Sequence, residues 1–137
     1  MTRVAAVDCG TNSIRLLIAD VDVTAGTLTD VTRTMTVVRL GQGVDKTGEF
    51  AADALERTLA ATDDYAAQCR DAGVEAVRFV ATSATRDARN RDEFLDGVRA
   101  RLGVTPEVIS GDEEARLSFR GATSVLDAGH DAPFLVA

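Results

Sequence analysis

A short polar stretch near the N-terminus holds the first residues that could do chemistry. The apolar run at 4–7 ends at Asp8, and apolar residues resume at Ile14. The residues between them are small or hydrogen-bonding, in the order Cys9, Gly10, Thr11, Asn12 and Ser13. Glycine lets a backbone approach a ligand closely, and successive N–H groups in such a turn can form a nest for an anion. A carboxylate repels phosphate, so Asp8 is better suited to hold a hydrated Mg²⁺ ion.

This stretch does not match the two commonest nucleotide-binding loops. A P-loop ends in Gly-Lys-Ser or Gly-Lys-Thr, but the chain's only lysine is Lys46. A dinucleotide-binding loop needs three spaced glycines and a following helix, whereas residues 14–21 have the pattern of a strand. A phosphate loop between antiparallel strands is instead typical of the actin, Hsp70 and sugar-kinase superfamily. Taken alone, the stretch is equally typical of a hairpin turn.

Two later polar stretches also follow predicted strands. The first contains three arginines beside Thr and Ser hydroxyls, and these are Arg86, Arg89 and Arg91. A guanidinium group suits bidentate phosphate contacts, although such a stretch is more often a solvated helix start. In the second, Ser110 and Glu113 have the spacing of a helix capping box. Glu114 lies one residue deeper, where its carboxylate is free to face the edge of the sheet.

The rest of the sequence predicts the strands and helices that position these stretches. Apolar and β-branched runs predict strands at 4–7, 14–21, 28–40, 74–81, 106–109 and 134–136. Apolar residues at helical spacing predict helices at 51–72, at 91–102 and from 111 onward. The order β-β-β-α-β-α-β-α predicts three antiparallel strands followed by parallel crossovers. The fold class is therefore α/β, a mixed sheet of about five strands similar to half of a ribonuclease-H-like or actin-like protein.

Several local expectations accompany this reading. Asn90 and Glu93 have capping-box spacing, residues 41–50 are expected to form a loop, and Tyr65 is expected at a helix edge. The inner face of the first helix is predicted to consist of Leu55, Leu59, Thr62, Ala66 and Cys69. That of the third helix is predicted to consist of Ala115, Phe119, Ala122 and Leu126.

Composition narrows the class of protein. The 137 residues suit one domain, and a net charge of −7 argues against a general nucleic-acid-binding protein. Apolar stretches stay well short of the roughly 20 residues that cross a bilayer, so no membrane partner is expected. Two cysteines indicate free thiols in a reducing cytoplasm rather than a disulfide framework. The strand-like ending APFLVA suggests that residues 1–137 are a single N-terminal domain of a longer protein.

Four stretches, in this order and spacing, are similar to the exopolyphosphatase / guanosine pentaphosphate phosphohydrolase (Ppx/GppA) family. They are AVDCGTNSIRLLIAD, RLGQGVD, VATSATRDARN and VISGDEEARLSFRGA. The resemblance runs across essentially the whole chain and implies an actin-like ATPase-type domain. In this family a second phosphate loop, in a second domain, follows the position of Ala137.

The resemblance implies a role for each candidate residue. The first phosphate loop would comprise Asp8, Gly10, Thr11, Asn12 and Ser13. Arg86 matches an arginine that contacts substrate phosphate, and Glu114 matches the glutamate that activates the attacking water. Mg²⁺ is expected near Asp8 and the aspartate of the second loop. The family also implies a cytoplasmic enzyme and leaves room for a homodimer of the full-length protein.

Several functions stay open at this point. The first is release of orthophosphate from the ends of inorganic polyphosphate, and the second is removal of the 5′-terminal phosphate of guanosine pentaphosphate. The third belongs to another class, a non-catalytic phosphate-binding or regulatory module. A sugar or acetate kinase is a weaker fourth, because it shares only the first loop. Without the second phosphate loop, residues 1–137 alone are expected to bind phosphate weakly and to be inactive.

Overall fold

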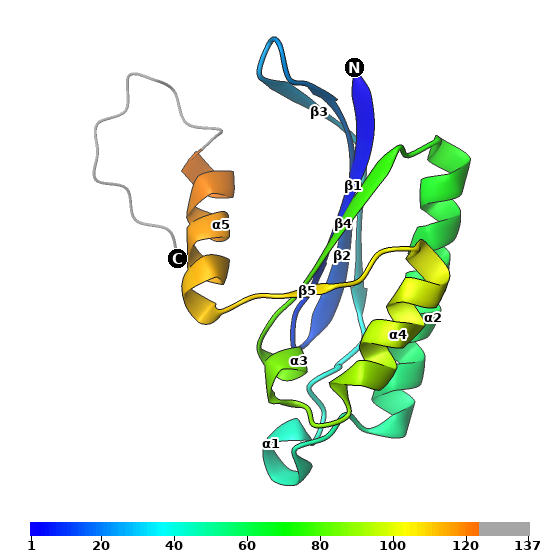
Figure 1. The fold of residues 1–137 in the computed structure, drawn as a ribbon, viewed down its shortest axis with the longest axis vertical. Helices are drawn as coiled ribbons and strands as arrows, with labels where there is room; N and C mark the ends of the chain where they lie inside the picture. The colour runs from blue at the N-terminus through cyan, green and yellow to red at the C-terminus, as the bar shows by residue number, and fades with distance from the viewer. Residues whose placement is uncertain (124–137) are drawn as a thin grey trace.

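The computed structural model describes residues 1–123 and forms one mixed five-stranded sheet with helices beside it (Figure 1). The strands are β1 (Thr2–Cys9), β2 (Ser13–Asp22), β3 (Thr27–Val37), β4 (Ala76–Ala81) and β5 (Glu107–Val108). The helices are α1 (Val44–Thr47), α2 (Ala52–Ala72), α3 (Ser83–Asp87), α4 (Arg91–Leu102) and α5 (Gly111–Thr123). The predicted fold class and the order of its main elements are confirmed. The predicted strand at 134–136 lies outside the described residues.

The order of strands brings three loops to one edge of the sheet. The sheet runs β3-β2-β1-β4-β5, with β1, β2 and β3 antiparallel and β1, β4 and β5 mutually parallel. The carboxyl ends of β1, β4 and β5 therefore share an edge, as the parallel crossovers predicted. Helices α2 and α4 lie together on one side of the sheet, and α5 lies on the other (Figure 1).

Alternation along β1 separates a core face from an open face. Ala5, Val7 and Cys9 are buried, whereas Ala6 and Asp8 are exposed. Because successive side chains of a strand point to opposite faces, Asp8 lies on the face opposite to Cys9. The core lies on the side of the buried residues, and α2 and α4 cover it.

The expectation for Tyr65 is wrong. Its side chain is fully buried, and its hydroxyl donates to the Ile14 carbonyl at 2.9 Å. The same hydroxyl lies 2.9 Å from Thr36 Oγ1. Tyr65 therefore joins α2 to the start of β2, immediately after the turn at residues 10–12, instead of covering a helix edge.

The predicted inner faces of two helices also need correction. In α2, Leu55 and Leu59 are only partly buried, because the buried face is rotated toward Ala54, Thr58, Ala61, Thr62, Tyr65, Ala66 and Cys69. In α5, Ala115 is exposed. Phe119, Ala122 and Leu126 of that predicted face lie outside the residues whose side chains are described.

The helix ends follow the sequence signals only in part. Ser110 caps α5 as predicted, because its Oγ accepts from the Glu113 N–H at 3.1 Å. The predicted capping box at α4 does not form, because Asn90 Oδ1 accepts from the Phe50 N–H at 2.8 Å instead. The predicted loop at 41–50 contains the short helix α1.

Candidate functional site

The turn between β1 and β2 has the geometry of an anion-binding loop. The Gly10 N–H donates to the Ser13 carbonyl at 3.0 Å, which closes the turn. Within residues 1–123, the N–H groups of Thr11 and Asn12 donate to no protein acceptor. Backbone N–H groups left free in this way are the groups that bind phosphate oxygens in a nest. The loop predicted from Gly10 to Ser13 therefore offers at least two donors to a ligand.

The start of α3 lies directly beside this loop. The Thr82 N–H donates to the Cys9 carbonyl at 3.2 Å, and Thr11 Oγ1 lies 2.9 Å from Ser83 Oγ. Thr82 is buried at the carboxyl end of β4. The first and second polar stretches of the sequence are thus brought into contact, as expected from parallel strand ends.

Asp8 and Glu114 line the same cavity. The cavity has a volume of about 310 Å³ and lies between the open face of the sheet and α5. Its other lining residues are Ala6, Val7, Arg78, Val80, Thr82, Ile109 and Leu117. Glu114 is exposed in the first turn of α5, where the N-terminal end of the helix favours a carboxylate. The structure therefore brings together the two carboxylates that the sequence singled out.

Two opposing influences act on the pKa of Asp8, and the larger of them raises it. Partial burial of the carboxyl group raises the pKa of Asp8, and the positive charge of Arg15 opposes that rise. Arg15 is the cross-strand partner of Asp8 in the ladder between β1 and β2. Sequence reasoning missed Arg15, although counting outward from the turn along both strands would have placed it opposite Asp8.

Arg86 belongs to α3, and its side chain reaches the chain just after β5. It is not among the residues that line the cavity. Its Nη1 donates to the Ile109 carbonyl, and Ile109 itself lines the cavity. The other two arginines of this stretch hold backbone carbonyls. Arg89 donates to Thr47 at 2.8 Å, and Arg91 donates to Arg86 at 3.4 Å. Of the three, Arg86 is the one that is hydrogen-bonded, within the described residues, to Ile109 and Thr82, which line the cavity.

The side chains near this turn suit a metal ion that keeps most of its water ligands, and not one that is enclosed by protein ligands. Within residues 1–123 there is no cluster of three or more His, Cys, Asp or Glu side chains that could hold a metal. Mg²⁺ commonly keeps several waters and is held by one or two carboxylates together with substrate phosphates. One accessible carboxylate, Asp8, beside a turn with free N–H groups fits that pattern, and Asp8 is the residue that could help to hold such an ion.

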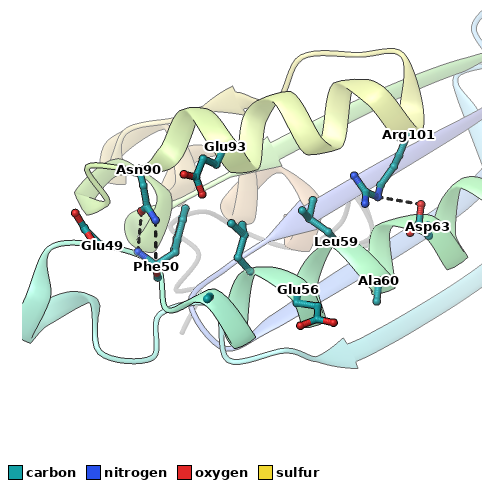
Figure 2. Close-up of a pocket in the computed structure, with 11 residues that line it drawn as sticks. Glu49, Phe50, Glu56, Leu59, Ala60, Asp63, Asn90, Glu93 and Arg101 are labelled. Carbon is teal, nitrogen blue, oxygen red and sulfur yellow. Dashed lines mark hydrogen bonds and ion pairs between the residues drawn. The ribbon is translucent and has the colours of Figure 1, made fainter.

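A larger cavity of about 780 Å³ lies elsewhere, between α2 and α4 (Figure 2). The ion pair between Arg101 and Asp63, 2.9 Å long, lies at one end of this cavity. At the other end the side chain of Asn90 is hydrogen-bonded to the backbone of Phe50. Its rim carries Glu49, Glu56 and Glu93, which would repel a polyanion. None of the predicted site residues lines it, so its size does not make it the phosphate site.

Among the helices of residues 1–123, none is long and apolar enough to cross a membrane.

Comparison with known proteins agrees with the fold and with the motifs. A model of the Ppx/GppA phosphatase family matches residues 17–137. Exopolyphosphatase 2 of Mycobacterium tuberculosis (strain H37Rv) is 55% identical, over 99% of this chain and 44% of its own length. The chain thus spans less than half of that relative.

Solved structures of two further relatives share the fold. A Ppx/GppA family member from Aquifex aeolicus is 34% identical with a TM-score of 0.82, over 91% of this chain and 40% of that one. An exopolyphosphatase from Cytophaga hutchinsonii is 30% identical with a TM-score of 0.83, over 90% of this chain and 39% of that one. Sequence, fold and matching model agree, and the chain belongs to the Ppx/GppA phosphatase family.

Proposed function

We propose that this chain is the N-terminal part of an exopolyphosphatase, which releases orthophosphate from the ends of inorganic polyphosphate. The observation that carries the proposal is the cavity shared by Asp8 and Glu114 at the same sheet edge as a loop with free N–H groups. The 55% identity to a protein named Exopolyphosphatase 2 supports the choice of substrate. Because the chain spans 44% of that relative, the activity is proposed for the longer protein.

The first loop would hold the terminal phosphate. The N–H groups of Thr11 and Asn12 would donate to its oxygens, together with the hydroxyl of Ser13. Catalysis of phosphoryl transfer consists mainly of positioning and charge stabilisation, so a rigid loop of donors contributes directly. Asp8 would hold a hydrated Mg²⁺ ion, which supplies positive charge next to the phosphates when it is bound.

Glu114 would accept the proton of the attacking water. The water oxygen forms a bond to the terminal phosphorus, the phosphoanhydride bond breaks, and orthophosphate leaves a chain shortened by one phosphate. The cavity that Glu114 shares with Asp8 would place this carboxylate next to the bound phosphates, as the role of general base requires.

Arg86 would offset negative charge on the transferred phosphoryl group. A guanidinium has five N–H donors, and one nitrogen of Arg86 is bonded to the Ile109 carbonyl. The remaining donors would be available to a phosphate while that bond fixes the side chain. A positioned arginine of this kind is worth about 10³–10⁵ in rate when it stabilises a phosphoryl-transfer transition state.

A cytoplasmic location is proposed with this function. Cys9 and Cys69, both within the described residues, are free and buried thiols, as suits a reducing compartment. A homodimer of the full-length protein stays a prediction that these residues do not test.

The experiment compares two neighbouring glutamates in the full-length protein. Phosphate release from inorganic polyphosphate is measured with Mg²⁺ present, and guanosine pentaphosphate is assayed side by side to compare kcat/KM. Glu114→Gln should lower kcat by about 10²–10⁴, the usual contribution of a general base. Glu113→Gln is the matched control, because it also lies in the first turn of α5 but does not line the cavity. Near-normal turnover of Glu114→Gln would refute the assigned role.

A further inference from the structure

Residues 38–41, which we name the clasp segment, bind the phosphate loop from the side of β3. The N–H groups of Val38 and Arg39 both donate to the Asn12 carbonyl, at 3.0 and 2.9 Å. The Gly41 N–H donates to the Thr11 carbonyl at 2.8 Å. Three donors from one segment thus hold two consecutive carbonyls at the tip of the loop.

These bonds determine which way the loop presents its donors. In a trans peptide the carbonyl and the following N–H point in opposite directions. When the clasp segment holds the Thr11 carbonyl, the Asn12 N–H must point away from it. The Asn12 carbonyl is held in the same way, so the Ser13 N–H also points away. The clasp segment therefore draws the carbonyl oxygens, which repel phosphate, to its own side and directs the N–H groups to the other.

Gly41 makes this contact possible because it has no side chain. A Cβ built on Gly41 would lie 2.2 Å from Thr11 Cγ2, far inside the roughly 3.5–4.0 Å of a normal carbon contact. The φ of Gly41 is not in the left-handed region, so glycine is needed here for space and not for a turn. Nearby Gly43 and Gly48 do have positive φ, and a Cβ on Gly43 would meet open space.

Arg39 adds a second sign that the clasp segment is held in place. Its φ is 51°, the left-handed region that a residue with a Cβ rarely adopts. This conformation brings the Arg39 N–H onto the carbonyl that Val38 also contacts. An exposed residue keeps an unfavourable backbone angle only where surrounding contacts fix it, and the bond to Asn12 is such a contact.

We propose that Gly41 is a positioning residue for phosphate binding, acting through the backbone of Thr11 and Asn12. This rests on the proposed function of the loop, since the substrate is taken to bind the Asn12 N–H, which the clasp segment orients. Any side chain at position 41 pushes Thr11 outward and misdirects that donor. A displacement of about 1 Å near reacting groups costs on the order of 10²-fold in rate.

The first test uses two glycines of the full-length protein at which an added Cβ would lie less than 3.0 Å from a side-chain carbon. Gly41→Ala should lower kcat/KM for polyphosphate by at least about tenfold, mainly through a higher KM. Gly97→Ala is the matched control, because its Cβ would lie 2.8 Å from Leu59 Cδ2 between α2 and α4, away from the site. The control variant Gly97→Ala should lower the Tm and keep kcat/KM within about threefold of wild type. Equal losses of kcat/KM in both variants would overturn the inference.

The second test asks whether the loss can be reversed at Thr11. Thr11→Ser keeps the hydroxyl but removes Cγ2, the atom that a Gly41 Cβ would strike. The double variant Gly41→Ala/Thr11→Ser should recover kcat/KM to within about threefold of Thr11→Ser alone. No recovery would overturn the inference, even if Gly41→Ala is impaired by poor folding.

Equilibrium binding separates this inference from the proposed function. The Kd of tripolyphosphate is measured by calorimetry for wild type, Gly41→Ala and the double variant. If the wild type binds tripolyphosphate but releases no phosphate, the proposed function fails, and a weaker Kd that Thr11→Ser restores still supports the positioning role. If the wild type hydrolyses polyphosphate and Gly41→Ala matches it in Kd and KM, the positioning role fails and the function stands.

Discussion

Replacing Tyr65 with phenylalanine tests how α2 supports the strand that follows the phosphate loop. The Tyr65 hydroxyl is fully buried and donates to the Ile14 carbonyl at 2.9 Å. A phenol has one proton to donate, so the Thr36 hydroxyl, 2.9 Å away, is the donor in the second bond. Tyr65→Phe therefore removes one buried and one partly buried hydrogen bond and leaves the ring in place.

The cost follows from the groups that lose a partner. A buried polar group left without its partner costs about 1–3 kcal/mol, so Tyr65→Phe should lower the free energy of unfolding by that amount. Thr36→Val is the matched control. It removes only the second bond, and Tyr65 keeps its contact with Ile14, so the expected loss is about 0.5–1.5 kcal/mol. The double variant should cost less than the two single variants combined, because they share one interaction.

Urea unfolding of the full-length protein and its variants at several pH values is the assay. Burial is the main influence that raises the pKa of Tyr65. An acid whose pKa is raised by folding contributes stability below its unfolded pKa, about 10 for tyrosine, and loses it as the pH rises further. The advantage of wild type over Tyr65→Phe should therefore be constant near pH 7 and shrink above about pH 10. Equal stability at pH 7, or an advantage that grows in alkali, would refute the reasoning.

Two further predictions concern β1. Because burial raises the pKa of Asp8, its ionised form destabilises the fold at neutral pH, so Asp8→Asn should raise the Tm at pH 7 while phosphate release in the presence of Mg²⁺ falls. A lower Tm for Asp8→Asn by calorimetry would contradict this. Burial also raises the pKa of Cys9 to about 12, so its thiol should resist iodoacetamide at pH 8 in the native protein and react after denaturation. Native alkylation of Cys9, read by peptide mass spectrometry, would contradict it.

Periodicity and turn residues were sufficient to predict the sheet and its main helices. The ends of α2 and α4 coincide with Gly73 and Gly103, both left-handed, where glycine signals a helix end. The meeting of Asp8 with Glu114 also followed from sequence, because parallel strands share their carboxyl edge. Such features depend on local pattern and on topology, which a single sequence reveals.

The errors lie where a distant residue outweighs a local preference. Asn90 has the spacing of a capping residue, yet its side chain binds the backbone of Phe50, forty residues earlier in the chain. The spacing of residues along the sequence does not show that a distant backbone group binds the Asn90 side chain in place of the helix end. In the same way, the contact of Gly41 with Thr11 joins segments thirty residues apart, and the sequence shows only a glycine in a loop.

The two carboxylates of the candidate site lie on elements that differ in how extensively they are hydrogen-bonded to the sheet. Asp8 belongs to the middle strand of the sheet, which is hydrogen-bonded on both sides along its length. Glu114 belongs to α5, which is joined to the sheet through the two residues of β5. Local unfolding begins where the fewest contacts must break, and among the described residues the strand before α5 is paired at two positions whereas β1 is paired along both sides. If the proposed roles hold, a partial opening of the fold would separate Glu114 from residues 10–13 while the core stays intact, and phosphate release would be lost on heating before the domain unfolds.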